Sequence, residues 1–259
     1  MIIMAKPKLV ILGVDGVLRD SSAAFNEGLA RGFMKVGLFQ PYLKNDLWRL
    51  RGIGKYNLRE NAVAAIYALS IQGKDLSEAL SLADSEGYLD SLTENSLNDA
   101  DRRRVARITE TSREFCNSSL ARYMSKLLPN ARNSIKCLKD SGHELAIFSN
   151  ASGPAIMRDL KEIGLENFSI ILSGSEVSMP KPSPEGLKRI ISEIGVSAEE
   201  AIYAGDAQVD IIAARNAGCI SAALLSGMGL KSHLESCGPS HIFENISELS
   251  RNLREMQTG

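Results

Sequence analysis

The sequence predicts an α/β fold: a doubly wound parallel sheet with an all-helical cap domain inserted after the first strand. An unbroken apolar segment at residues 8–14 is typical of a strand that is covered on both faces. Residues 22–128 then show helical periodicity and no strand pattern. From Pro129 onward, strand patterns alternate with helix patterns, which favours a parallel sheet with crossover helices.

The inserted segment consists of amphipathic stretches. Apolar residues at three- and four-residue spacing, followed by glycine, predict helices at residues 22–37 and 57–73. The charged stretch at residues 99–128 is also amphipathic, and residues 20–22 offer good N-cap side chains. We therefore expect two domains: residues 1–21 and 129–259 form the α/β core, and residues 22–128 form the helical cap.

The second half of the chain supplies the rest of the sheet. We expect its strands at residues 143–150, 167–174, 200–206, 219–227 and near 241–243. We expect its helices at residues 131–142, 153–164, 183–195, 208–218 and 247–256. In such sheets, ligands bind beyond the carboxyl ends of the strands, so the candidate site should lie in those loops.

Composition and charge exclude several classes of partner. The chain has 44% hydrophobic and 24% charged residues and a net charge of −1, so it has no global field that would attract nucleic acid or an anionic membrane. The densest basic run, Arg102 to Arg104, has acidic neighbours and is typical of a solvated helix face. No apolar run is long enough to span a membrane, and the N-terminus does not resemble a signal peptide.

The cysteines and histidines show no metal-binding pattern. The four cysteines have no close pair that resembles a metal knuckle or a redox motif: Cys116, Cys137, Cys219 and Cys237. Free thiols in a reducing compartment are the expected state, so we predict a cytoplasmic protein. The three histidines also lack the helical spacing of metal ligands.

Candidate site residues follow two of the predicted strands. Asp15 and Gly16 follow the first strand, where an ordinary turn is the alternative reading. Ser149 and Asn150 end a later strand; a hydroxyl and an amide there can hydrogen-bond an anionic oxygen, although Ser-Asn is also a common turn pair. Each signal is weak when it is taken alone.

Two further candidate motifs contain charged side chains. Lys181 lies between two prolines that restrict the backbone, which suits a fixed cationic partner for phosphate; a solvated loop lysine is the alternative. Asp206 ends a strand, and Asp210 lies in the first turn of the next helix, a spacing that can direct two carboxylates toward one magnesium ion. The alternative is helix capping by Asp206 with Asp210 favouring the helix dipole.

In this order, with a helical insertion after the first strand, the signatures resemble the haloacid dehalogenase (HAD) superfamily, in its phosphatase branch with a helical cap. The resemblance to phosphoglycolate phosphatase-like enzymes runs from Leu9 to about Leu253. It implies a Rossmann-like core and magnesium-dependent hydrolysis of a small phosphomonoester. The expected partner is therefore a small phosphorylated metabolite, with no nucleic acid and no membrane.

The resemblance also assigns roles to the phosphate-binding residues. It implies that Ser149 hydrogen-bonds the phosphoryl group and that Asn150 supports it. Lys181 would neutralise the phosphate and the nucleophile, and Gly16 would lie against the phosphate.

The remaining roles concern acid–base catalysis and the metal. By resemblance, Asp15 is the general acid–base, and its backbone carbonyl binds magnesium. Asp206 would ligate magnesium directly, and Asp210 would help to position the ion. The presence of Asp15 favours phosphoester chemistry over dehalogenation, because a leaving halide needs no proton.

One expected catalytic residue is missing. The family's nucleophilic aspartate would have to be residue 13, which is Gly13. Loss of a nucleophile typically costs on the order of a millionfold in turnover. One metal ligand is also lost, so we expect weaker magnesium affinity, and Lys181 can then pair with Asp206.

Three explanations of Gly13 remain open. In the first, the protein is a non-catalytic relative that binds a phosphate-bearing ligand or another protein. In the second, it hydrolyses its substrate slowly, with water as the attacking group. In the third, the glycine was introduced to inactivate the protein, although asparagine or alanine is the more common replacement for that purpose. Whether the chain is an enzyme is therefore undecided. Substrate choice belongs to the cap, where Arg19, Arg51 and Lys55 are polar candidates near the entrance.

Overall fold

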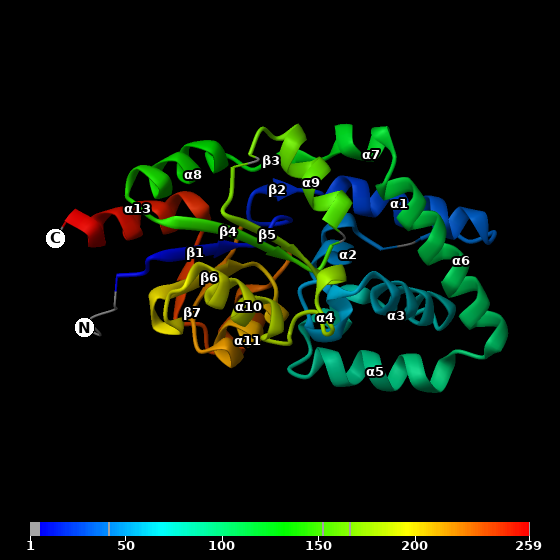
Figure 1. The fold of residues 1–259 in the computed structure, drawn as a ribbon. Coiled ribbons are helices and arrows are strands. Elements are labelled where there is room, and N and C mark those ends of the chain that lie inside the picture. Colours follow the sequence, from blue (N-terminus) through cyan, green and yellow to red (C-terminus); the bar gives the residue numbers. More distant parts are fainter. Residues whose placement is uncertain (1–5, 41, 152, 166, 259) are drawn as a thin grey trace. The chain divides into compact units, whose positions relative to one another are not determined.

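The computed structural model describes residues 6–40, 42–151, 153–165 and 167–258. Its contacts divide the chain into two compact units (Figure 1). The core unit comprises Met1–Asp20 and Lys126–Gly259, and the helical unit comprises Ser21–Ser125. The boundaries expected from the sequence lie one and three residues later, at 21/22 and 128/129.

The core unit is built on a six-stranded parallel sheet with the order β5-β4-β1-β6-β7-β8. Its strands are β1 (Leu9–Leu12), β4 (Glu144–Ser149), β5 (Ile170–Ser173), β6 (Ala201–Gly205), β7 (Ile220–Leu224) and β8 (His241–Phe243). All five neighbouring pairs are parallel. The strand β1 lies centrally between β4 and β6, and its four side chains are fully buried. This arrangement confirms the predicted fold class.

Helices cover both faces of this sheet (Figure 1). One face packs against α8 (Ala131–Asp140), α9 (Gly153–Glu162) and α13 (Ile246–Thr258). The other face packs against α10 (Glu185–Ile194) and α11 (Gln208–Ala217), with α12 (Lys231–Ser236) beside α11. Because both faces are buried, the strands are mostly apolar rather than alternating.

The helical unit contains seven α-helices among its described residues: α1 (Ser22–Lys35), α2 (Lys44–Leu50), α3 (Arg59–Ile71), α4 (Leu76–Ser81), α5 (Ser85–Ser96), α6 (Asp99–Cys116) and α7 (Ser119–Met124). A short 3₁₀ turn, η1 (Gly54–Asn57), precedes α3. The helices α1 and α6 approach closely, because a side chain at Gly32 would lie 2.7 Å from the backbone oxygen of Ile108.

Three features differ from the sequence-based expectation. The strand β3 (Lys126–Leu127) lies in the segment that was expected to hold no strand, and it pairs antiparallel with β2 (Arg19–Asp20). The expectation was wrong because a two-residue strand has no detectable periodicity. The stretch at residues 99–128 also divides, since Ser118 caps α7 by accepting a hydrogen bond from Ala121 N. The helix α12 was not predicted.

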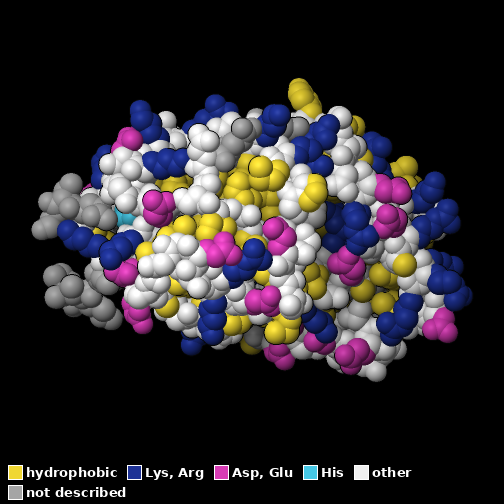
Figure 2. Space-filling model, viewed as in Figure 1, with side chains coloured by type: hydrophobic (Ala, Val, Ile, Leu, Met, Phe, Trp, Pro, Cys, Tyr) yellow, Lys and Arg dark blue, Asp and Glu magenta, His cyan; other side chains and the backbone are white. Residues whose placement is uncertain are grey.

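The surface carries charges of both signs (Figure 2), and the cysteines form no disulfide among the described residues. Basic and acidic side chains are mixed over the face in Figure 2. Within the described part of the chain, no helix has both the length and the apolarity needed to cross a membrane. The four cysteines are free thiols.

Candidate functional site

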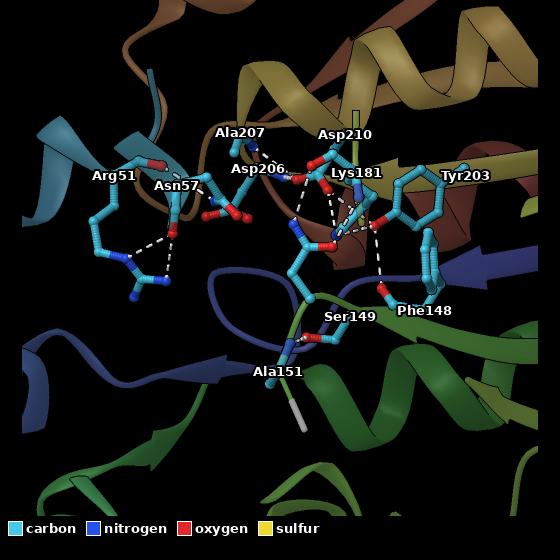
Figure 3. Close-up of polar contacts among 11 residues, drawn as sticks. Arg51, Asn57, Phe148, Ser149, Ala151, Lys181, Tyr203, Asp206, Ala207 and Asp210 are labelled. Carbon is cyan, nitrogen blue, oxygen red and sulfur yellow. Dashed lines mark hydrogen bonds and ion pairs between the residues drawn. The ribbon is translucent and has the colours of Figure 1, made fainter. Parts of the chain in front are cut away.

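A buried network joins Lys181, Asp210 and Tyr203 (Figure 3). The ammonium of Lys181 donates to Asp210 Oδ1 at 2.6 Å and to the Tyr203 hydroxyl at 2.7 Å. The Tyr203 hydroxyl lies 2.9 Å from Asp210 Oδ1 and 3.2 Å from the carbonyl oxygen of Phe148, and its single proton serves one of them. The Lys181 and Asp210 side chains are only 7% and 5% exposed. The lysine charge is therefore fixed in place and largely desolvated.

The end of β4 holds the loop that carries Lys181. The Asn150 side chain accepts a hydrogen bond from Lys181 N at 3.0 Å and donates one to Lys181 O at 3.3 Å. This two-way contact fixes residue 181 from the neighbouring strand end. Tyr203 comes from the middle of β6 and Asp210 from the first turn of α11, so side chains of two elements converge on the ammonium.

Asp206 and Asp210 do not point toward one common centre. Asp210 Oδ2 accepts hydrogen bonds from Asp206 N (3.1 Å) and Ala207 N (3.0 Å), which caps α11. Asp206 Oδ2 instead accepts from Met228 N at 2.8 Å. The expectation that Lys181 pairs with Asp206 is wrong, because Asp210 takes that position. The capping alternative is correct in part, with Asp210 as the capping residue.

The electrostatics of these groups follow from burial. Burial, together with the nearby charge of Asp210, raises the pKa of Asp206 to about 7. Burial and the same Asp210 charge raise the pKa of Tyr203 well above its usual value, so the phenol stays protonated. The pKa of Asp206 places a change of charge within this cluster near neutral pH.

Two glycines enclose the Asp206 carboxylate. A Cβ at Gly16 or at Gly227 would lie 2.0 Å from Asp206 Oδ2. Gly16 has a φ of +74°, which glycine adopts without strain, and its carbonyl accepts a hydrogen bond from the Ser226 hydroxyl at 2.7 Å. The loop after β1 therefore lies directly against the end of β6.

Asp15 is held by Arg19, the first residue of β2. Arg19 donates to Asp15 Oδ1 through Nη2 (2.8 Å) and Nε (3.1 Å), and its Nη1 lies 2.8 Å from Asp159 Oδ1 of α9. Burial raises the pKa of Asp159, although the Arg19 charge opposes this shift. Burial alone would lower the pKa of Arg19, but the charges of Asp15 and Asp159 outweigh it and raise that pKa. No local sequence pattern indicates the role of Asp159.

A side chain at Gly13 would require the Val17 side chain to shift by a few tenths of an ångström. Gly13 N donates to Ala204 O at 2.9 Å and so extends the pairing of β1 with β6. A Cβ at Gly13 would lie 3.1 Å from Val17 Cγ2, 3.7 Å from Ala204 O and 3.9 Å from the Tyr203 hydroxyl. A side chain at this position would thus emerge beside the Lys181 network.

Ser149 is the last residue of β4 and is nearly buried. Its hydroxyl accepts a hydrogen bond from Ala151 N at 3.3 Å. Direct contacts therefore join Lys181 with Asn150 and Asp210, while Ser149 adjoins them as the neighbour of Asn150 (Figure 3). Tyr203 was missed because it lies in an apolar strand; the available signal was that a buried tyrosine hydroxyl needs a partner.

The carboxylates do not fit a tightly held divalent cation. No cluster of three or more His, Cys, Asp or Glu side chains able to hold a metal occurs among the residues that the structure describes. The Asp15 carboxylate is paired with Arg19, and both oxygens of Asp210 are engaged. Among the described residues Asp206 forms no direct ion pair, although the nearby Lys181 charge opposes the rise of its pKa. One carboxylate is a minimal donor set even for Mg²⁺, which usually keeps several waters.

The polar candidates in the helical unit have partners there. Arg51 Nη2 donates to Asn57 O at 3.1 Å (Figure 3), and Lys55 Nζ lies 2.9 Å from Asp90 Oδ2. Arg19, in contrast, belongs to the core unit.

The parallel sheet and the polar side chains at the ends of its central strands define a doubly wound α/β protein with its candidate site at the strand ends. The chain belongs to the haloacid dehalogenase-like hydrolase family, whose model matches residues 10–224. This membership confirms the resemblance at the level of the superfamily.

The curated relatives that resemble this chain include phosphoglycolate phosphatases. The chain is 27% identical over 146 residues to a phosphoglycolate phosphatase of Haemophilus influenzae, covering 56% of this chain and 65% of the relative. It is 33% identical over 130 residues to the phosphoglycolate phosphatase of Neisseria gonorrhoeae, covering 49% of this chain and 55% of the relative. The chain thus spans slightly less than two thirds of the first of these relatives.

Solved structures share the fold. A protein from Lactobacillus delbrueckii subsp. bulgaricus, to which a phosphoglycolate phosphatase activity is ascribed, has a TM-score of 0.77 at 22% identity, covering 96% of this chain and 99% of that chain. A hydrolase from Pseudomonas syringae has a TM-score of 0.66 at 21% identity, covering 96% and 98%.

Proposed function

We propose that this protein binds a small phosphomonoester at the carboxyl end of the core sheet and hydrolyses it only slowly. The observation that carries the proposal is the position of Gly13: a side chain there would emerge 3.9 Å from the Tyr203 hydroxyl, beside the fixed charge of Lys181. The family relationship supports phosphoester chemistry. The missing carboxylate at residue 13 removes the attacking group.

The remaining residues support binding more than turnover. Lys181, held by Asn150, supplies a fixed positive charge for the phosphate, and the Ser149 hydroxyl supplies a hydrogen bond beside it. Residual hydrolysis then depends on direct attack by water, with the bond from phosphorus to the leaving oxygen breaking as that oxygen gains a proton. Positioning and charge stabilisation are the only contributions left to such a reaction.

We infer that magnesium binds weakly. The ligand expected from residue 13 is absent at Gly13 and Lys181 pairs with Asp210, so the Asp206 carboxylate and the Asp15 backbone carbonyl remain as the expected ligands. No step of the proposed reaction is therefore assigned to the ion.

Binding can be tested with inorganic phosphate as the probe. Titration calorimetry should give saturable binding to the wild type, weakened at least tenfold in Lys181→Ala. The exposed Lys188 of α10 provides the matched control, and Lys188→Ala should bind as the wild type does. Circular dichroism must show that the variants are folded. Equal affinity of the two lysine variants would refute the assignment of Lys181.

Chemistry can be tested at residue 13. With p-nitrophenyl phosphate and magnesium, Gly13→Asp should raise turnover by several orders of magnitude, of the size lost when a nucleophile is removed. The control Gly13→Asn has almost the same shape and no nucleophilic carboxylate, so it should give no gain. A folded Gly13→Asp variant without gain would show that residue 13 is not the nucleophile position.

The second candidate is a non-catalytic protein that binds a phosphate-bearing ligand or a protein partner. The absence of a side chain at Gly13 supports this candidate as much as it supports slow hydrolysis. Wild-type turnover above that of Lys181→Ala or Asp15→Ala would eliminate this candidate, whereas phosphate binding with no turnover would support it.

A further inference from the structure

A cavity of about 370 Å³ lies between α8 and α13 of the core unit. We propose that it is a second anion site, which binds the phosphate group of a small molecule. Its lining shares no residue with the Lys181 network, so this site is independent of the proposed function. Three features support it: two facing helix surfaces, the charge of the lining and one buried hydroxyl.

The two helices present polar side chains to the cavity from opposite sides. Those at the start of α8 have the three- and four-residue spacing of one helix face: Asn130, Asn133, Ser134 and Cys137. Those of α13 have the same spacing and include Ser247, Arg251 and Arg254. Ile135 of α8 and Leu249 of α13 are buried in one apolar cluster, so the two helices are packed together and the walls of the cavity are fixed.

The cavity is positively charged. Its described lining contains two arginines and no carboxylate. Arg251 forms no ion pair with any residue that the structure describes, and Glu248, one turn earlier, accepts a hydrogen bond from Glu244 N instead. A guanidinium offers a phosphate two parallel donors. The N-terminus of α8 adds to the positive potential, because the side chain of its N-cap residue Asn130 makes no capping hydrogen bond.

A buried hydroxyl indicates where an anion would bind. Ser134 is only 2% exposed and lines the cavity, and its hydroxyl has no hydrogen-bond partner in the described part of the chain. Burial of a polar group without a hydrogen bond is unfavourable, and a bound oxyanion would accept from this hydroxyl. Ser134 and Arg251 lie on opposite walls, so an anion between them would be held by both helices.

The size and shape of the cavity favour a phosphate that carries a small organic part. Pockets for small molecules begin at about 300 Å³, which this cavity exceeds. A phosphate has acceptor oxygens in several directions and can accept from both walls at once. The two oxygens of a carboxylate lie in one plane and suit one wall only.

Cys137 is a local reporter of binding, because it lines the cavity and is partly exposed. The experiment measures its alkylation by iodoacetamide with peptide mass spectrometry, in inorganic phosphate and in sodium chloride of the same ionic strength and pH. Bound phosphate should slow the reaction by the factor 1 + [L]/Kd, about fivefold at four times Kd. Cys116 of the helical unit, also partly exposed, should react at the same rate in both buffers.

Two variants identify the groups that bind. Arg251→Gln loses the charge and should raise the Kd for protection of Cys137 at least about tenfold, which is about 1.4 kcal/mol. Ser134→Ala should weaken protection as well. Arg132→Gln is the matched control, because it removes an exposed arginine of α8 whose guanidinium lies against Gly164 and not in the cavity lining. It should be protected as the wild type is.

Four results would overturn the inference. The first needs no variant: a wild type in which phosphate does not protect Cys137. The second is equal protection of Arg251→Gln and the wild type. The third is stronger protection by acetate than by phosphate, which would make the ligand a carboxylate. The fourth is loss of protection in a folded Lys181→Ala protein, because phosphate would then act from the candidate functional site.

Discussion

Lys181 and Asp210 form an ion pair, 2.6 Å between Nζ and Oδ1, in which both side chains are almost fully buried. Removing one partner of a buried pair leaves the other charge uncompensated, which typically costs about 3–5 kcal/mol. Lys181→Ala should therefore lower the free energy of unfolding by that amount in urea denaturation followed by circular dichroism. Lys188→Ala, at an exposed position, should stay within about 0.5 kcal/mol of the wild type. Similar values for the two variants would mean that the pair does not form in solution.

The stability of the protein should depend on pH through Asp206. Its pKa is about 7 in the folded protein and about 3.8 for an ordinary aspartate. Between these values the folded state binds more protons than the unfolded state, so the contribution of Asp206 to stability falls as pH rises from 3.8 to 7 and is constant above 7.

Thermal melts in EDTA provide the measurement. Asp206→Asn keeps an acceptor for Met228 N and removes the titration. The melting temperature of the wild type minus that of Asp206→Asn should therefore decrease between pH 4.5 and pH 7. The two histidines whose pKa burial lowers, His143 and His241, titrate in both proteins and cancel in this difference. A difference that does not change with pH would contradict the assignment.

Gly16 should tolerate substitution much less than a glycine with the same backbone conformation elsewhere in the core unit. Gly16 and Gly195 have φ values of +74° and +76°, so alanine costs about 1–2 kcal/mol at either position. A Cβ at Gly195 meets nothing within 4 Å, whereas one at Gly16 would lie 2.9 Å from Gly227 Cα and 2.0 Å from Asp206 Oδ2. Gly16→Ala should therefore cost about 1–3 kcal/mol more than Gly195→Ala in urea denaturation. Equal costs would show that the loop does not pack on Asp206.

Much of the core fold could be predicted because burial leaves a clear trace in the sequence. The run from Leu9 to Leu12 is apolar at every position, and the structure makes it a central strand covered on both faces. The alternation of strands and helices after Pro129 gave the parallel sheet for the same reason. The strands β2 and β3 could not be found, because two residues carry no period.

The candidate site could be predicted only in part. Asp15 stood out because it follows a strand, and Lys181 because it lies between two prolines. The resemblance to a known family then placed these residues in one site. Their partners were not visible, since the Arg19–Asp159 pair joins residues that are distant in the chain and Tyr203 resembles an ordinary core residue. Long-range ion pairs depend on packing that no local pattern encodes.

The antiparallel pairing of β2 with β3 has a consequence for removing or replacing the helical unit. Asp20 is the register partner of Lys126, so the chain leaves the core unit and re-enters it at adjacent backbone positions. A tight hairpin turn is geometrically enough to join these two residues in place of everything from Ser21 to Ser125. The connectivity of the core unit thus allows a different insertion between Asp20 and Lys126 without a change in the path of any core strand.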